Sequence, residues 1–224
     1  MEKDPFGSNA GSYDRWYDNN PAVYGSELET IKELLPPEIA RNSIEIGAGT
    51  GRFASVLGIS YGLDPSERML EIAGKRGIGT IRGIAEELPL KSSSLMLVLM
   101  VTSLCFVDIE KSLREIYRVL VPEGELIIAF IERNSLLGKE YQRKSLESDF
   151  YRNATFYSAG ELIEILSRHG FYEPVIRQTL FRSLSEVKVV EHPEEGYGKG
   201  SFVAIRTTSI KKNEETSLKT KVSQ

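Results

Sequence analysis

The sequence predicts a doubly wound α/β fold built on a mostly parallel sheet of seven strands. Strand-like and helix-like segments alternate from about residue 43 to residue 132, which is the pattern of consecutive βαβ units. Residues 95–101 (LMLVLMV) are all apolar, as expected of a central strand that has helices on both faces. Glycines at 47, 49 and 51 follow the first strand-like segment, at the point where a helix should begin.

Local signals place the elements of the parallel part in order. Pro65 suits the first turn of a helix, and Asp108 suits an N-cap. Leu113, Ile116 and Leu120 recur at helical spacing in the segment that Asp108 opens. The expected strands are 43–46, 59–63, 77–82, 95–101 and 125–131, with helices from 51, 65 and 108 and a turn at 122–124.

The N-terminal segment, residues 12–35, is expected to form a helical cap. Ser26 and Glu29 have the spacing of a capping box, in which two side chains satisfy backbone N–H groups at a helix start. Apolar Ile31, Leu34 and Leu35 follow this pair, so we expect a helix to begin at Ser26.

The C-terminal third interrupts the strand–helix rhythm. Residues 135–157 are polar over much of their length and are expected to form a substrate lid, although a solvated amphipathic helix explains them equally well. Ser158 should begin a helix that Gly170 ends, and 171–181 and 201–207 should form an antiparallel hairpin. We therefore expect one domain over residues 1–208 and a disordered tail over 209–224.

The composition is that of an ordinary globular protein and disfavours several functions. The 224 residues suffice for one substantial domain, and a net charge of −4 argues against a large nucleic-acid surface. Cys105 is the single cysteine, which rules out an internal disulfide and, with only two histidines, a Cys/His zinc site, so we expect no metal. Because there is no apolar signal segment and no apolar run of membrane-spanning length, we expect a cytoplasmic protein without a membrane partner.

The glycine-rich turn and the acidic residue after it indicate a ligand site. Asp64 ends the second strand, where a carboxylate can accept hydrogen bonds from ribose hydroxyls, and both features lie at the carboxyl edge of the sheet. The turn reads G-x-G-x-G, whereas the dinucleotide fingerprint G-x-G-x-x-G requires glycine where this chain has Arg52. Alone, the turn would be explained by a tight strand–helix connection; Asp64 favours the ligand site.

Five segments together resemble the class I S-adenosylmethionine-dependent methyltransferases, in particular the group that includes quinone-biosynthesis and small-molecule methyltransferases. In chain order they are 45–51 (EIGAGTG), 62–69 (GLDPSERM), 83–89 (GIAEELP), 118–126 (RVLVPEGEL) and 156–164 (FYSAGELIE), the last followed by Gly170. The match runs over residues 12–207 and implies a Rossmann-like methyltransferase fold, with S-adenosyl-L-methionine as the cofactor.

The resemblance implies roles for individual positions. The glycines would admit the methionine part of the cofactor, Asp64 would hold the ribose, and Ala85 would offer its backbone N–H to adenine. Ser66 and Met69 would flank the adenine, and Val101 would line the methionine end. The implied cofactor-binding set is Tyr13, Trp16, Glu45, Gly47, Ala48, Gly49, Gly51, Asp64, Pro65, Ser66, Met69, Ala85, Glu86 and Val101.

The aromatic residues of the N-terminal segment have two interpretations. Tyr13, Trp16 and Tyr17 resemble the helix that closes over the cofactor in these enzymes. Packing of that helix against the domain explains the same residues without any ligand.

Two positions depart from the family pattern. Ile84 stands where many relatives have an aspartate that accepts from the adenine amine, so Glu86 or backbone and apolar contacts would have to hold the ring. Leu95 and Met96 stand where the fourth strand of the family commonly begins with Phe-Asp, which indicates a repacked strand edge. These departures leave open a cofactor-binding protein without catalysis, and Arg52 disfavours the other alternative, an NAD-dependent oxidoreductase.

The expected reaction is methyl transfer to a small-molecule N, O or C nucleophile by in-line displacement. The cofactor already carries an activated methyl group, so a catalytic base is optional and the sequence designates none. Cys105 reads as packing and His169 as a helix C-terminal cation, while Thr102 and Ser103 could bind the acceptor or simply form a loop. Residues 100–104 (MVTSL) do not contain the Asn/Asp-Pro-Pro-Tyr/Phe motif with which methyltransferases of nucleic-acid bases hold their target base. The acceptor and the oligomeric state stay open.

Overall fold

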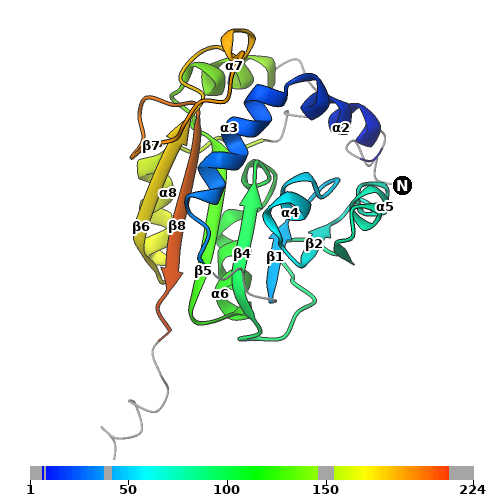
Figure 1. The fold of residues 1–224 in the computed structure, drawn as a ribbon. Helices are drawn as coiled ribbons and strands as arrows, with labels where there is room; N and C mark the ends of the chain where they lie inside the picture. The colour runs from blue at the N-terminus through cyan, green and yellow to red at the C-terminus, as the bar shows by residue number, and fades with distance from the viewer. Residues whose placement is uncertain (1–6, 8, 38–41, 146–153, 212–224) are drawn as a thin grey trace, which may run out of the picture.

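One sheet of eight strands runs through the part of the chain that the computed structural model describes, residues 7, 9–37, 42–145 and 154–211 (Figure 1). Its order is β3-β2-β1-β4-β5-β8-β6-β7. The first five are mutually parallel, and β8 lies antiparallel between β5 and β6. The strands are β1 (Ser43–Ile46), β2 (Tyr61–Asp64), β3 (Gly79–Arg82), β4 (Leu95–Val101), β5 (Leu120–Ile131), β6 (Phe171–Thr179), β7 (Glu194–Glu195) and β8 (Phe202–Ser209).

The predicted α/β fold and its antiparallel β6–β8 pair are confirmed, with one strand more than expected. β7 has two residues, Glu194 and Glu195, and pairs with β6 at the sheet edge. Two residues carry no periodicity, so a pattern-based analysis cannot detect such a strand. The expected strands at 59–63 and 77–82 begin two residues later than predicted, at Tyr61 and Gly79.

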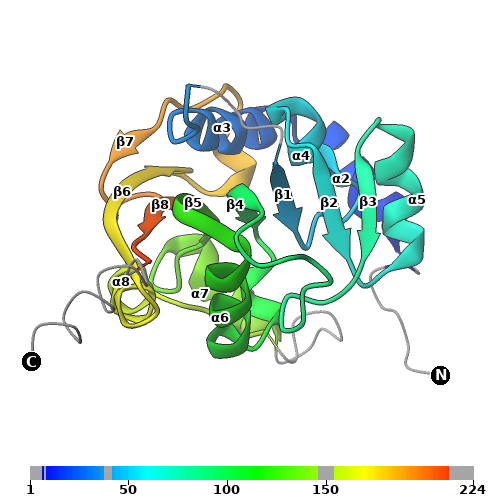
Figure 2. The ribbon, with the colours of Figure 1, turned by 90° about the horizontal axis from the view of Figure 1, so that it is seen from below.

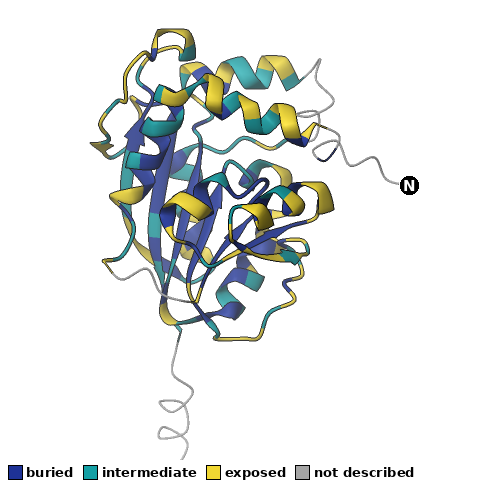
Figure 3. Cartoon of the chain, turned by 45° about the vertical axis from the view of Figure 1, so that its right-hand side comes forward, coloured by how far each residue is buried: buried dark blue, intermediate teal, exposed yellow. Residues whose placement is uncertain are grey.

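Helices cover both faces of the sheet, with α3 and α4 on one side and α6 and α8 on the other (Figure 2). The sheet itself is mostly buried, while the outer faces of the helices are exposed (Figure 3). The helices are α2 (Ala10–Asn19), α3 (Pro21–Lys32), α4 (Arg52–Leu57), α5 (Glu67–Lys75), α6 (Ile109–Val119), α7 (Leu136–Ser145) and α8 (Ala159–Arg168), with short 3₁₀ turns η1 (Leu104–Phe106) and η2 (Leu184–Glu186). None of these helices is long and apolar enough to cross a membrane.

The position of β4 explains its uninterrupted apolar sequence. Leu97 and Leu99 belong to the hydrophobic cluster under α3 and α4, whereas Val98 and Met100 belong to the cluster under α6 and α8. Alternate side chains of a strand point to opposite faces, and both faces of this strand are covered. Met96, which departs from the family pattern, is 47% exposed at the start of the strand, so its substitution leaves the core intact.

The N-terminal cap is two helices, α2 and α3, and the second begins at Pro21 rather than at Ser26, so the expected capping box is wrong. The helical segment is interrupted at Asn20, because Pro21 lacks a backbone N–H and occupies the first turn of α3 instead of continuing α2. Ser26 therefore lies inside α3, where its hydroxyl donates to the carbonyl of Ala22 at 2.7 Å. Glu29 pairs with Lys32 on the exposed side of the same helix.

The expected turn at 122–124 is absorbed into β5, which begins at Leu120 directly after α6. Leu120 pairs with Leu95 and Glu125 pairs with Leu97, so the intervening residues bulge out of the ladder. Glu123 within the bulge has a φ of +62°.

Other predicted helix ends are confirmed. The carboxylate of Asp108 accepts from the N–H of Lys111, and Ser158 forms a capping box with Glu161. Gly170 follows α8 with a φ of +85°. β8 extends through Ser209, one residue beyond the expected domain end, and the rest of the expected tail from 212 lies outside the described residues, as do 146–153 of the expected lid.

Candidate active site

A pocket of about 1320 Å³ opens at the carboxyl ends of the parallel strands. Its wall includes residues of α2 and α3, the glycine turn after β1, the β2–α5 connection, the end of β4 and helix α7. Figure 1 shows α2 and α7 on the side of the sheet toward which β1 and β4 point. Sites for a single ligand usually measure roughly 300–1,000 Å³, so this pocket has room for two molecules.

The glycine turn has the backbone conformation that its sequence requires. Gly47, Gly49 and Gly51 have φ values of +71°, +53° and +74°, a region that other residues rarely adopt. The N–H groups of Gly47 and Ala48 both donate to the carbonyl of Leu63, which fixes the turn against the end of β2. The turn then leads directly into α4, whose N-cap is Gly51.

Replacing Gly51 with alanine is expected to lower the free energy of unfolding by about 2–3 kcal/mol. An added Cβ would lie 2.5 Å from Cδ1 of Ile78 and 3.2 Å from Cα of Ala73, so the backbone of α5 would have to move. At Gly49 the added Cβ would meet only Tyr13, at 3.6 Å, so Gly49→Ala should cost about 1 kcal/mol, from its positive φ alone. Urea denaturation measures both; equal losses would contradict this difference.

Asp64 joins the glycine turn to the start of α5. One carboxylate oxygen accepts from the N–H of Gly49 at 2.9 Å, and the other accepts from the N–H of Ser66 at 2.8 Å. The Ser66 hydroxyl in turn caps α5 by accepting from the N–H of Met69. Each carboxylate oxygen can accept more than one hydrogen bond, so Asp64 keeps acceptor capacity for hydroxyl groups of a ligand.

Glu45 supports the glycine turn from the interior of the protein. It is buried, and one carboxylate oxygen accepts from the N–H of Ala54 at 2.8 Å, at the start of α4. Burial raises the pKa of Glu45 to about 8, against the opposing effect of the Ala54 N–H. Glu45, Ala48 and Gly51 form no part of the pocket wall; they shape the turn.

All the other residues in the predicted set line the pocket. The wall contains Tyr13, Trp16, Gly47, Gly49, Asp64, Pro65, Ser66, Met69, Ala85, Glu86 and Val101. Ile84 lines it too and is 47% exposed. One carboxylate oxygen of Glu86 accepts from the N–H of Asp108, so this side chain also anchors the start of α6.

The aromatic residues of α2 pack against the domain, as one of the two interpretations expects, and they also line the pocket. The hydroxyls of Tyr13 and Tyr17 lie 2.9 Å apart, and the Tyr17 ring contacts Tyr24 and Phe53 edge-on at 5.2 and 5.7 Å. Tyr13, Tyr17 and Trp16 are also part of the pocket wall. Burial, together with the nearby hydroxyl and carboxyl groups, raises the pKa of Tyr17 well above its ordinary value.

An ionic clasp that the sequence analysis missed holds α2 over the glycine turn. The Asp14 carboxylate accepts from the Thr50 hydroxyl at 2.7 Å, from Arg52 at 2.8 Å and from Arg76 at 2.9 Å. Burial raises the pKa of Asp14, but hydrogen bonds from Arg52, Arg76 and Thr50 outweigh it and lower the pKa to about 2. Arg52 thus has a structural reason to stand where the dinucleotide fingerprint has glycine. Asp14 reaches partners 36 to 62 positions away, so no local pattern could reveal the clasp.

The segment after β4 forms the opposite side of the pocket. The Ser103 hydroxyl donates to the carbonyl of Ile46 at 2.9 Å, which ties this segment to the end of β1. Cys105 lines the pocket, and burial raises the pKa of its thiol to about 12, so it is not a thiolate at neutral pH. His169 lies outside the pocket wall and pairs with Glu110 at 2.9 Å. Within the described residues, no cluster of three or more His, Cys, Asp or Glu side chains is placed to hold a metal ion.

The fold and the site define a class of protein: a doubly wound α/β protein with a glycine turn and an acidic residue at the carboxyl ends of neighbouring strands, the edge at which such folds bind nucleotide-type cofactors. Comparison with known proteins gives the family. Residues 44–128 match the family model described as "Methyltransferase domain". An uncharacterized protein of Methanocaldococcus jannaschii is 42% identical over 206 residues, which cover 92% of this chain and 98% of the relative.

Solved structures agree with this assignment. A Thermotoga maritima protein described as a "SAM-dependent methyltransferase, possible histamine N-methyltransferase" has a TM-score of 0.86 and 46% identity, covering 91% of this chain and 97% of that one. A Haemonchus contortus phosphoethanolamine N-methyltransferase, bound to S-adenosylhomocysteine, has a TM-score of 0.61 at 16% identity, covering 83% of this chain and 52% of that one, and shares the fold. The chain belongs to the S-adenosylmethionine-dependent methyltransferases; it is an enzyme, and S-adenosylmethionine is its cofactor.

The residues of the pocket fit this cofactor. Gly49 leaves open space beside the turn, where an added Cβ would find only the Tyr13 ring within 4 Å. Asp64 presents acceptor oxygens at the neighbouring strand end, and apolar Ile84 and Met69 line the same side of the pocket. Ile84 replaces the usual aspartate without closing the pocket.

Proposed function

We propose that this enzyme transfers a methyl group to a small molecule by in-line displacement. Of the three kinds of nucleophile that such a transfer allows, N, O and C, we propose nitrogen as the acceptor atom. The observation that carries the proposal is the extent of the pocket. Beyond Asp64 and the glycine turn it continues past Val101 to Cys105, Tyr141 and Phe156. That part of the pocket is separate from the residues that suit the nucleoside, and its wall is largely apolar and aromatic, as small-molecule sites usually are.

The cofactor supplies a methyl group activated by the sulfonium charge, so the task of the chain is to position and desolvate the acceptor. We assign cofactor binding to the eleven residues of the predicted set that line the pocket, and support of the turn to Glu45, Ala48 and Gly51. Leu137 and Tyr141 of α7 line the acceptor side, which supports the proposal that this segment acts as a lid. A cytoplasmic location, without nucleic-acid or membrane partners, is part of the same proposal.

The preference for nitrogen rests on the Thermotoga maritima relative, because its description names a histamine N-methyltransferase at 46% identity. The other acceptor atoms are alternatives that the experiment below separates.

Calorimetric titration and a turnover assay test the proposal together. S-adenosylmethionine and S-adenosylhomocysteine are expected to bind, and NAD is not. S-adenosylhomocysteine production should then rise at least tenfold over background with one or more small amines, and not with matched phenols or carboxylates. A panel in which phenols or carboxylates alone are turned over would move the acceptor from nitrogen to oxygen. Cofactor binding with no acceptor in any class would overturn the small-molecule proposal.

A further inference from the structure

Glu27 is a buried carboxyl group in the wall of the pocket. It lies in the middle of α3, between the buried Val23 and Ile31, and is only 5% exposed. Part of that remaining exposure faces the pocket, since Glu27 is one of the lining residues. A glutamate is almost never this buried unless something pairs with it.

No described residue pairs with Glu27 through a hydrogen bond or an ion pair, and its carboxyl oxygens are not fully enclosed by the protein, so they reach the open space of the pocket. The other buried carboxylates of the site differ in this respect. Glu45 accepts from the N–H of Ala54, and Asp64 accepts from the N–H groups of Gly49 and Ser66. Burial alone raises the pKa of Glu27 to about 8. A buried acceptor without a partner costs on the order of 1–3 kcal/mol, so packing alone does not account for a glutamate here.

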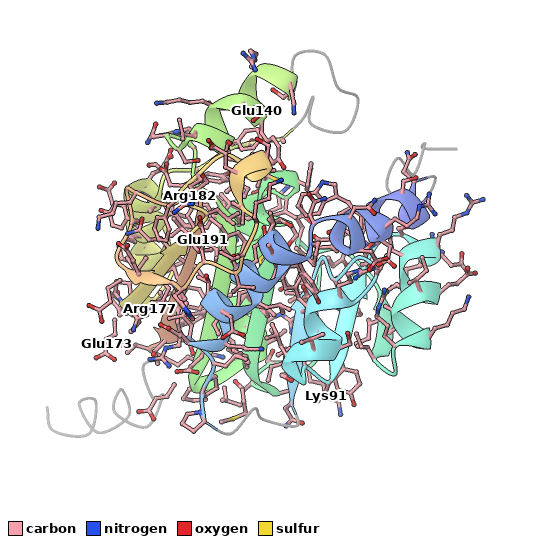
Figure 4. All side chains as sticks on the ribbon, turned by 45° about the horizontal axis from the view of Figure 1, so that its top comes forward. Lys91, Glu140, Glu173, Arg177, Arg182 and Glu191 are labelled. Carbon is pink, nitrogen blue, oxygen red and sulfur yellow. The ribbon has the colours of Figure 1, made fainter. Side chains whose placement is uncertain are left out.

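The position of α3 is fixed, so Glu27 cannot escape to solvent by a shift of the helix. Ser26 accepts from the N–H of Glu191 at 2.8 Å, and Arg177 pairs with Glu33 at 2.7 Å. Figure 4 shows the labelled Arg177 and Glu191 beside this helix, on the β6–β8 side of the molecule. The helix is thus held from both its middle and its C-terminal end.

The surroundings of Glu27 are aromatic and anionic rather than cationic. Tyr13, Trp16 and Tyr17 line the same pocket, and the Glu27 charge contributes to the raised pKa of Tyr17 and of Tyr24. Glu45 acts on the same two tyrosines and is also an acid, so it gives Glu27 no counter-ion.

The cations of the pocket wall lie elsewhere. Arg68 and Arg82 belong to the β2–β3 side of the pocket, and Arg82 pairs with Glu67 at 3.6 Å. Arg52 and Arg76 are engaged by Asp14 in the clasp. An unpaired carboxylate beside aromatic rings is the arrangement that recognises an ammonium group, through an ion pair and cation–π contact.

We propose that Glu27 binds the ammonium group of a ligand in this pocket. The inference rests on the proposed function, and the ammonium group has two sources: the amino-acid part of the cofactor, or an amine acceptor. Either ion would give Glu27 the partner that the described residues do not supply.

Calorimetry on the full chain and on Glu27→Gln tests the proposal, with three probes. S-adenosylhomocysteine carries the α-ammonium group, 5′-methylthioadenosine lacks it, and histamine, added after S-adenosylhomocysteine, represents the amine acceptor. Glu29→Gln is the matched control, because Glu29 lies on the exposed side of the same helix and pairs with Lys32. Thermal melts should show that Glu27→Gln is at least as stable as the wild type, since it removes an unpaired buried acid.

A loss of tenfold or more in S-adenosylhomocysteine affinity, with 5′-methylthioadenosine unchanged, assigns Glu27 to the cofactor. A similar loss for histamine alone assigns it to the acceptor. Because the empty Glu27 is largely protonated at pH 7 and its ammonium complex is ionised, binding should also release protons in the wild type and not in Glu27→Gln.

The inference would be overturned if Glu27→Gln bound both S-adenosylhomocysteine and histamine with wild-type affinity. It would also be overturned if neither the wild type nor Glu27→Gln bound histamine and the substitution left the affinity for S-adenosylhomocysteine unchanged. The proposed function fails differently. If the wild type turns over phenols or carboxylates and no amine, nitrogen methylation is wrong, while the S-adenosylhomocysteine titration still decides whether Glu27 holds the cofactor.

Discussion

Replacing Asp64 with asparagine is expected to weaken S-adenosylhomocysteine binding at least 100-fold. The Asp64 carboxylate accepts from the N–H groups of both Gly49 and Ser66, and it faces the pocket where the ribose is expected. The asparagine amide can accept on one side only, so its NH₂ group would point at one of the two N–H donors. Losing one charge-assisted hydrogen bond costs about 1.5–3 kcal/mol, and a factor of 100 corresponds to about 2.7 kcal/mol.

Calorimetric titration measures this loss, and Glu67→Gln is the control. Glu67 lies three residues further on and also lines the pocket, but its side chain is 74% exposed and pairs only loosely with Arg82. Glu67→Gln should change the affinity for S-adenosylhomocysteine less than threefold. Near-UV circular dichroism identifies any misfolded Asp64→Asn sample. A folded Asp64→Asn enzyme that binds within threefold of the wild type would show that Asp64 only shapes the turn.

Replacing Asp14 with asparagine is expected to lower the free energy of unfolding by at least about 2 kcal/mol and to weaken S-adenosylhomocysteine binding about tenfold. The substitution leaves Arg52 and Arg76 next to each other without the charge that both contact. The aromatic side of the pocket should loosen with them, because Tyr13 and Trp16 stand on the same helix as Asp14.

The pH dependence of stability provides a second reading of the same clasp. The pKa of Asp14 is about 2 in the folded protein, whereas the ordinary value of 3.8 applies in the unfolded chain. The unfolded chain therefore binds the proton more readily. The stability contributed by Asp14 is therefore complete above about pH 4 and is lost as the pH falls towards 2. Asp14→Asn should flatten this part of the acid unfolding curve.

Asp18→Asn is the matched control for the clasp. Asp18 contacts Arg52 from the same helix, but its side chain is 60% exposed and reaches none of the other clasp residues. An equal effect of the two substitutions, on stability and on affinity, would mean that general charge on α2 matters rather than the buried carboxylate.

The parts of the structure that could be predicted are those whose cause is local. The turn after β1 needs glycine at three positive-φ positions, the apolar run of β4 follows from coverage on both faces, and Asp108 and Ser158 cap helices within three residues. Each of these relations joins neighbours in the chain, so the sequence displays it directly.

The parts that were missed depend on distant neighbours. Asp14 finds Arg76 across 62 positions, and nothing at either site marks the pair. No role was predicted for Glu27, because none of its neighbours in the chain marks it as buried. The boundary at Asn20 is the exception: Pro21 is a local signal for a helix start, but the prediction rested on the Ser26–Glu29 spacing.

The location of β8 bears on how the protein is made. It is the last strand in the described chain, yet it lies in the interior of the sheet and pairs with β5 on one side and β6 on the other. During synthesis, β6 emerges from the ribosome before its main partner, β8, has been made. Helix α3 emerges far earlier, but it packs against β6 and β8 and so cannot complete its contacts until both strands are present. Residues 202–209 must therefore have left the ribosome before this half of the sheet is complete, whereas β1 to β4 have all their sheet partners among β1 to β5.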